Sequence, residues 1–356
     1  MKSLTSHLFK PLLFYLLICG FVTKAQTQLT FAKSTLPNLS SNYCIQIIQD
    51  FRPIQNTIGN IIINQKSENL TLISDLPKAL KKHLPDTYFS NKTGFQILIK
   101  IQAFNLIEKQ ISPQKIEGKF RLKFIFEIIR DEQTSVFLTE YSGGNSILRS
   151  PNAILAYQQS IAMAIDKSII YFDKWIKTNE KIAPQLAQFV KIKFINPQII
   201  QQDDTVFYPK HLSWADFRAS AANKRKYQAS VFTSFSYEGN ATVQDGIIVL
   251  EISTKTYMLK EGSWAMDIAK NDPESLIHEQ RHFDISQIAT NRFKKTLSIE
   301  LFSIDDYNSQ VQYLFLEAYR EHQKLQEQYD TETNHGQNST AQNYWNNWID
   351  AQLGLK

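Results

Sequence analysis

Apolar and polar residues alternate along much of the first half of the chain, which is the pattern of strands with one face buried. A helical pattern interrupts this alternation over Asp75–Lys82 and over Pro151–Lys177, where apolar residues recur every four positions. Pro151 follows Ser150, as is typical of the first turn of a helix. We therefore expect a sheet with helices on one side, with strands at Cys44–Phe51, Asn60–Asn64, Gly94–Leu106, Lys119–Ile129 and Ser135–Glu140.

The order of elements changes in the second half, where strands come first and long helices follow. Asp272 before Pro273 is a good helix start, and Ser339 with Gln342 has the spacing of a capping box. Strands followed by helices indicate an α+β domain rather than a doubly wound sheet. The strands are predicted at Ser230–Tyr237, Gly246–Ser253 and, as a shorter candidate, Lys255–Leu259, and the helices at about 273–302, 304–328 and 339–352.

A polar join at Asn179–Asp204 contains Pro184 and Pro197, so we predict the domain boundary there. The first domain is then an α+β unit of unknown role at residues 26–195, and the second occupies residues 200–356. Val190–Ile195, inside the join, is compatible with a strand of either domain.

Residues 1–25 have the features of a secretory signal peptide. Lys2 and Lys10 precede the apolar run Pro11–Val22, and Thr23-Lys24-Ala25 places small residues at −3 and −1 of a cleavage site. The run is too short to span a membrane, and no second apolar span follows. The sequence therefore predicts a secreted or periplasmic protein without a transmembrane segment.

Removal of this segment changes the charge and the cysteine content. Basic residues fall from 39 to 36 without Lys2, Lys10 and Lys24, against 34 acidic residues, so the net charge is about +2. The sequence has no basic stripe, and we predict no nucleic-acid partner. Cys19 leaves with the signal peptide, so Cys44 has no partner for an intrachain disulfide.

The segment His278-Glu279-Gln280-Arg281-His282 is an HExxH motif near the start of the predicted helix that begins at Pro273. Residues four apart lie on the same face of a helix, so the two imidazoles can bind one zinc ion. Glu279 then lies beside the metal, where it can act on a bound water. A polar helix that carries two histidines by chance is the alternative, and the strong helix start favours the zinc site.

A catalytic zinc ion usually has three protein ligands, and HExxH supplies two. One known arrangement places a Gly three residues and a His six residues past the second His, but Ile285 and Ile288 occupy these positions. Glu300 lies 18 residues past His282. In an unbroken helix this is about 27 Å, which is out of reach. Glu317 and Glu321 would approach only if the second long helix folds back suitably.

A better source of the third ligand is the segment Tyr329–Gly336, predicted as a loop after a helix that can return the chain to the motif. His335 is the first candidate and Asp330 the second, because His is the commoner zinc ligand. Gly336 permits a tight backbone next to His335. His83 and His322 are predicted to be surface residues.

These segments together resemble a family of bacterial proteins of unknown function described as predicted secreted zinc-dependent proteases. The resemblance covers about residues 205–353 and is carried by Leu212–Phe217, Ser263-Trp264, Leu276–Ile285 and Tyr329–Gly336. The stretches HEQxHFDI and YDxxTxHG are more specific than HExxH alone. Gln287 stands where an acid is frequent in the family, which argues against a supporting role at this position.

The resemblance implies a peptidase-like zinc site formed by His278, His282 and His335, with Glu279 as the catalytic residue. The predicted fold is an N-terminal sheet-plus-helix domain followed by a zincin-like α+β metalloprotease domain. The N-terminal block lies outside the resemblance, so its role stays open.

The predicted activity is hydrolysis of amide bonds in a peptide or protein substrate, with one zinc ion per chain and Glu279 as general base. Tyr329 is a candidate donor to the oxyanion, and a packed aromatic at a helix end is the alternative. An extended substrate would pair with Gly246–Ser253 if that strand is an edge. Two other hypotheses are a zinc-binding envelope protein without turnover, acting as a binding or structural module, and a structural envelope protein with an incidental HExxH.

Overall fold

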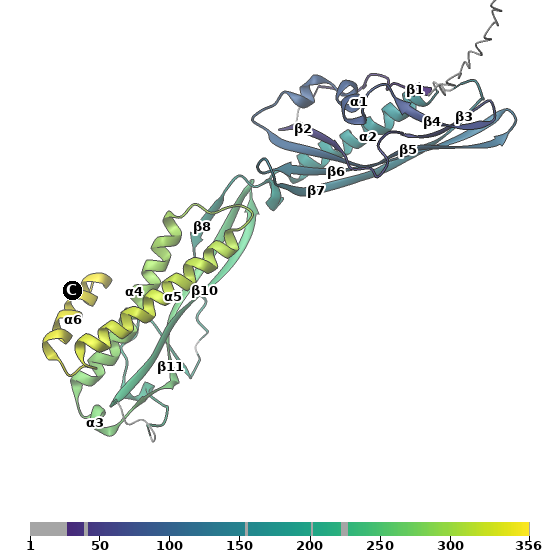
Figure 1. Ribbon diagram of the computed structural model, residues 1–356. Coiled ribbons are helices and arrows are strands. Elements are labelled where there is room, and N and C mark those ends of the chain that lie inside the picture. The colour runs from purple at the N-terminus through teal and green to yellow at the C-terminus, as the bar shows by residue number, and fades with distance from the viewer. Residues whose placement is uncertain (1–26, 39–41, 154–155, 201, 222–226, 356) are drawn as a thin grey trace, which may run out of the picture. The chain divides into compact units, whose positions relative to one another are not determined.

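The computed structural model describes residues 27–38, 42–153, 156–200, 202–221 and 227–355 (Figure 1). The predicted signal peptide lies outside these residues. The chain divides into two compact units, one running up to Glu127 and including Thr139–Tyr171, the other formed by Ile128–Leu138 and the chain from Phe172 onward. None of the described helices is both long and apolar enough to cross a lipid bilayer.

The first unit is built on a seven-stranded mixed sheet in the order β1-β4-β3-β5-β6-β7, with β2 also paired to β5. All the predicted strands of the first half occur, and β5 extends well past its predicted end. The strands are β1 (Thr27–Leu29), β2 (Tyr43–Asp50), β3 (Gly59–Ile63), β4 (Lys66–Leu72), β5 (Phe95–Ser112), β6 (Lys115–Ile129) and β7 (Ser135–Arg149).

Helices α1 (Leu76–His83) and α2 (Ala156–Asn179) accompany this sheet, with a short 3-10 turn η1 (Asp86–Phe89). Asp75 caps α1, because its side chain accepts a hydrogen bond from the backbone N–H of Lys78. The apolar positions spaced by four in α2, from Tyr157 to Ile169, are buried as predicted. A Cβ added at Gly118 of β6 would meet the ring of Tyr157, so α2 lies directly on the sheet.

The second unit contains a four-stranded sheet in the order β10-β11-β8, with β9 also paired to β11. Its strands are β8 (Val190–Phe194), β9 (Thr205–Phe207), β10 (Ala229–Gln244) and β11 (Ile247–Ala265). Because β8 pairs in parallel with β11, it belongs to this sheet and not to the first domain of the prediction, which ran to residue 195. β11 has partners on both sides, so the condition that Gly246–Ser253 be an edge strand is not met. β10 is an edge strand, and β8 and β9 lie on the other side of β11.

Four helices complete the second unit: α3 (Asp267–Lys270), α4 (Pro273–Ile299), α5 (Tyr307–Thr333) and α6 (Ser339–Leu353). Two short 3-10 turns, η2 (Pro184–Leu186) and η3 (Trp214–Asp216), lie in the preceding connections. Figure 1 shows α4 and α5 side by side along the β10–β11 pair. Their shared core contains Phe235 and Leu250 of the sheet, Phe293 of α4 and Val311 of α5.

Two local predictions in this unit need correction, the loop before residue 334 and the capping box of the last helix. The segment 329–333, predicted as a loop, is the last turn of α5, which ends only where Asn334 takes a left-handed conformation with φ of 48°. Asn338 caps α6 by accepting from the N–H of Ala341, so Ser339 is not the cap. Gln342 is buried inside the unit and is not part of a capping box.

Candidate functional site

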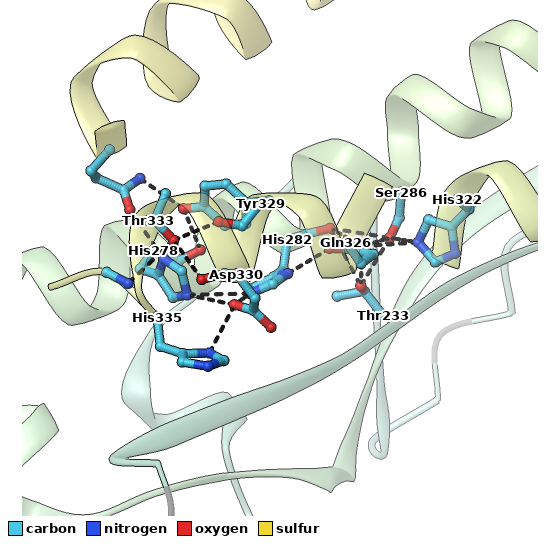
Figure 2. A network of polar contacts seen from close by, with 12 residues as sticks. Thr233, His278, His282, Ser286, His322, Gln326, Tyr329, Asp330, Thr333 and His335 are labelled. Atoms are coloured by element: carbon cyan, nitrogen blue, oxygen red, sulfur yellow. Dashed lines mark hydrogen bonds and ion pairs between the residues drawn. The ribbon is translucent and has the colours of Figure 1, made fainter. Parts of the chain in front are cut away.

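The two histidines of the motif lie on the buried face of α4, four residues apart. Their Nε2 atoms are 3.3 Å from each other and the ring planes are nearly perpendicular. One turn of helix separates them, which is why the local sequence alone places both imidazoles at one point. Figure 2 shows both rings turned toward α5.

Helix α5 runs antiparallel to α4 and places its own side chains at the same point. His322, Gln326 and Asp330 are four residues apart on α5, and they face Ser286, His282 and His278 of α4 in reverse order. Asp330 Oδ1 lies 3.2 Å from His278 Nε2 and 3.0 Å from His282 Nε2 (Figure 2). The site is therefore the meeting of two polar stripes on neighbouring helices.

Three potential ligand atoms thus converge: the Nε2 atoms of His278 and His282 and one carboxylate oxygen of Asp330. Their mutual distances of 3.3, 3.2 and 3.0 Å are close to the edge of a tetrahedron around zinc, about 3.3 Å for ligands at about 2.0–2.1 Å. Two imidazoles and a carboxylate are also a donor set that zinc accepts. The spacing and the chemistry of these three side chains therefore fit a zinc ion.

Glu279 lies beside this group and is buried. Its backbone partner is Val231, at the bulge where the pairing of β10 with β11 shifts between Ser230 and Phe232. The other carboxylate oxygen, Oε2, is buried and has no hydrogen-bond partner. Burial raises the pKa of Glu279, and the neighbouring His282 and His278 oppose that rise.

His335, the first candidate for the third ligand, lies next to Asp330 but outside the converging group. Its Nδ1 is 3.4 Å from Asp330 Oδ1, and its ring packs against Tyr227 with centroids 4.2 Å apart. About a third of its side chain is exposed (36%), against 6% for His278 and 12% for His282. The place beside both motif histidines is taken by Asp330, the second candidate.

The chain reaches His335 through an unusual backbone. Asn334 and His335 both have positive φ, 48° and 53°, and Gly336 follows with φ of 81°. Positive φ is costly for residues with a Cβ, and such strain concentrates at functional sites. A Cβ on Gly336 would lie 3.2 Å from the ring of His278, so glycine permits the close approach expected at this position.

Tyr329 is fully buried, and its ring stacks on His278 and meets His282 edge-on. Its hydroxyl donates to the backbone carbonyl of His278 at 3.3 Å and accepts from Gln342 Nε2 at 2.7 Å. The single hydroxyl proton is thus already used. In this arrangement Tyr329 packs against the site and supports it, and it offers no free donor to an oxyanion.

Charge in the cluster is balanced by protons. Burial would raise the pKa of Asp330, but hydrogen bonds to His278 and His282 outweigh it and hold the pKa below its usual range. Burial would lower the pKa of His282, but Asp330 and Glu279 outweigh it and raise the pKa. His322 has no such partner, and burial together with the charge of His282 lowers its pKa to about 4.

Several residues of the site were missed in the sequence. His322 was predicted at the surface but is buried. Gln326 received no role and Gln342 was assigned to a capping box, although their amides bind the two motif histidines. The spacing 322, 326, 330 was a usable signal, since three polar residues four apart share one face of a helix. His83, also predicted at the surface, is buried in the first unit, where it bonds to Asp166.

Comparison with known proteins adds little to this description. No protein-family model and no curated protein matches the chain. Among solved structures, a crystal structure of a protein from Xanthomonas campestris, described as belonging to family DUF330, aligns with 42% of this chain and 87% of its own at 7% sequence identity. Its TM-score is 0.24, too low to carry an argument about fold or function.

Proposed function

We propose that this protein is a zinc-dependent hydrolase of amide bonds, with a zincin-like arrangement of sheet and helices in its second unit. The observation that carries the proposal is the convergence of His278 Nε2, His282 Nε2 and Asp330 Oδ1, with the buried carboxylate of Glu279 beside them. This combination is what metal-assisted hydrolysis needs: three ligands and an adjacent base.

Each residue has a separate task in this proposal. His278, His282 and Asp330 would hold the zinc ion, which when bound lowers the pKa of a water toward neutrality and polarises a carbonyl. Glu279 takes the proton of the attacking water and later gives it to the leaving amine. Its raised pKa suits this double role, because a base that must also act as an acid works best near neutral pH.

His335 has two possible tasks. Its nearness to Asp330 and its more exposed ring suit a side chain that meets the substrate or the developing oxyanion. It also stays the alternative third ligand, because its Nδ1 lies 3.4 Å from Asp330 Oδ1. The two tasks differ in one measurable way: only a ligand is needed for zinc to stay bound.

The edge strand β10 is a suitable place for an extended substrate. It has β11 on one side and no strand on the other within the described part of the chain. It also carries Val231, whose backbone contacts Glu279. A peptide that adds to this edge would have its backbone next to the base, which suits a peptide or protein substrate. With the predicted signal peptide, such a hydrolase would act outside the cytoplasm.

One observation favours a second candidate, a zinc-binding protein without turnover. His278 and Glu279 are each only 5% exposed, so little of the motif is open to a large substrate. In this candidate the zinc ion would fix α4 to α5 and stabilise a binding or structural module.

Elemental analysis of purified residues 26–356 is the first test, with Asp330→Ala and His335→Ala measured beside the unmodified chain. We expect one zinc per chain in the unmodified protein and in His335→Ala, and a sharp loss in Asp330→Ala. Loss in His335→Ala alone would make His335 the ligand. No zinc in the unmodified chain after refolding with metal would contradict the proposed function. Cleavage of a broad peptide library then separates the hydrolase from the binding protein.

A further inference from the structure

Both motif histidines present their second ring nitrogen to a glutamine. His282 Nδ1 lies 2.5 Å from Gln326 Oε1 on α5, and His278 Nδ1 lies 3.0 Å from Gln342 Oε1 on α6. An amide oxygen only accepts hydrogen bonds, so each Nδ1 must carry the proton. The orientation of the two amides therefore decides which nitrogen of each imidazole is left to bind a metal.

The amide of Gln326 can take only one orientation. Its nitrogen donates to the backbone carbonyl of His282 at 2.9 Å and lies 2.9 Å from His322 Nε2. A carbonyl oxygen has no proton to give, so a flipped amide would set two oxygens against each other. His322 also suits this orientation as an acceptor, because its lowered pKa keeps it neutral near pH 7.

The amide of Gln342 is fixed in a parallel way. Its nitrogen donates to the hydroxyl of Tyr329 at 2.7 Å and to Asn346 Oδ1 at 3.0 Å. The hydroxyl of Tyr329 in turn donates to the backbone carbonyl of His278 at 3.3 Å. Each glutamine thus joins the ring and the backbone carbonyl of one histidine, Gln326 directly and Gln342 through Tyr329.

We propose that Gln326 and Gln342 are positioning residues that hold both motif histidines with a proton on Nδ1 and with Nε2, the nitrogen left for a metal ion, facing Asp330. The effect of the two glutamines on zinc affinity rests on the proposed function. The position of the proton on each Nδ1 follows from the hydrogen bonds alone. Metal ligation by histidine commonly depends on such a partner for the other ring nitrogen. Here the partner is a neutral amide, so the rings are oriented without adding negative charge.

Zinc affinity of the full chain from residue 26, measured by competition with a chelator, tests the proposal in Gln326→Leu and Gln342→Leu. We expect each variant to lose roughly 10–100-fold in affinity, because the ring loses its acceptor. Gln326→Glu keeps an oxygen at Nδ1, so it should lose less affinity than the leucine variant, although its second oxygen faces the backbone carbonyl of His282. Gln326→Asn stays polar but is one methylene shorter, and we expect it to lose affinity like the leucine variant.

Exposed glutamines on the same helices give matched controls. Gln328→Leu on α5 and Gln352→Leu on α6 make the same chemical change away from the histidines, and should bind zinc normally. Circular dichroism of the metal-free proteins checks that every variant folds. If a leucine variant does not fold, the asparagine and glutamate variants still test the proposal.

Proton NMR of the imidazole N–H groups gives a readout that does not depend on activity. The unmodified protein should show a slowly exchanging Nδ1–H signal for each motif histidine, and Gln326→Leu should lose only that of His282. Unchanged affinity together with both signals in Gln326→Leu would overturn the proposal. Both signals in a chain that binds no zinc would support the positioning role while contradicting the proposed function.

Discussion

Each of the two units buries a cluster of charged side chains. We call the cluster of the first unit closed, because each of its polar hydrogens has an acceptor within it or on the backbone. We call the cluster of the second unit open, because several acceptor atoms in it face one another. In the first unit Arg149 and Glu108 have fully buried side chains and form two parallel hydrogen bonds of 2.6 and 2.7 Å. The remaining donors of the guanidinium reach the carbonyls of Ser150, Pro151 and Ile62. Every proton of this cluster has an acceptor, as a buried ion pair requires.

The cluster of the second unit is held differently. Because each glutamine accepts the proton of one Nδ1, only the Nε2 side of each ring faces Asp330, and two Nε2 atoms and a carboxylate oxygen meet across 3.0–3.3 Å. Acceptors that converge in this way need a proton or a cation between them. A closed cluster thus indicates a structural role, whereas an open, acceptor-rich cluster indicates a place for a ligand.

The largest effect is expected from Glu279→Gln, which removes the base and leaves the three converging atoms in place. The rate of hydrolysis of a peptide that the unmodified protein cleaves should fall by about 10²–10⁴-fold, while zinc content stays at one per chain. Glu274→Gln, in the exposed first turn of the same helix, is the control and should change neither. Full activity in Glu279→Gln would remove Glu279 from the mechanism.

Arg149→Met should break the closed cluster and leave the open one intact. The variant leaves Glu108 charged and buried, so the first unit should lose about 3–5 kcal/mol of unfolding free energy. Four of the five tryptophans, from Trp214 onward, lie in the second unit, whereas Trp175 lies on α2, so in a Trp175→Phe background tryptophan fluorescence reports on the second unit alone. We expect the fluorescence transition to stay in place while the circular dichroism gains an earlier one.

The exposed Arg121 gives the control, since Arg121→Met removes a charge from the same unit without uncovering a buried partner. An equal shift of the fluorescence and circular dichroism transitions in Arg149→Met would show that the units do not unfold separately.

A smaller effect is expected from pH acting on His322, which is buried and neutral, unlike the permanently charged Arg149. Its pKa is lowered in the folded protein to about 4, so the unfolded chain binds the proton first as pH falls. Stability is therefore present above about pH 6.5 and lost toward pH 4, on the order of 3 kcal/mol. His322→Gln, which cannot titrate, should show a smaller loss.

Urea unfolding at about pH 4.5 and about pH 7, followed by tryptophan fluorescence with a chelator present, measures this difference. The same loss in the variant and the unmodified chain would assign the pH dependence to other groups of the second unit.

The smallest effect is expected from Gly336→Ala, which tests how closely the open cluster is packed. Gly336 and Gly354 both have positive φ, 81° and 66°, so alanine should cost about 1 kcal/mol at either position. Only at Gly336 would the new Cβ meet the ring of His278; at Gly354 nothing lies within 4 Å. We expect zinc affinity to fall in Gly336→Ala but not in Gly354→Ala. Equal zinc affinities of the two variants would show that the ring of His278 lies farther from the backbone of Gly336.

Much of the fold followed from local pattern, and the predictions failed where that pattern is weak or where the partner is distant in sequence. The apolar spacing in α2 and the start of α4 at Asp272 and Pro273 are properties of a few neighbouring residues, and the structure agrees. Strand β4 was missed because only Leu70 and Thr71 of its seven residues are buried, so its sequence shows little alternation. β8 could not be assigned to a sheet, because its partner β11 lies more than 50 residues further on.

The sequence by itself determined the pair His278 and His282 and the neighbouring Glu279, because one turn of helix fixes their spacing. It narrowed the third ligand to the segment that contains Asp330 and His335 but ranked them by how often each residue type binds zinc. Only the tertiary structure brought Asp330 to both histidines, because the extent of α5 and its antiparallel packing on α4 decide which turn faces the motif. The partners Gln326 and Gln342 follow from the same packing, which no local rule of sequence contains.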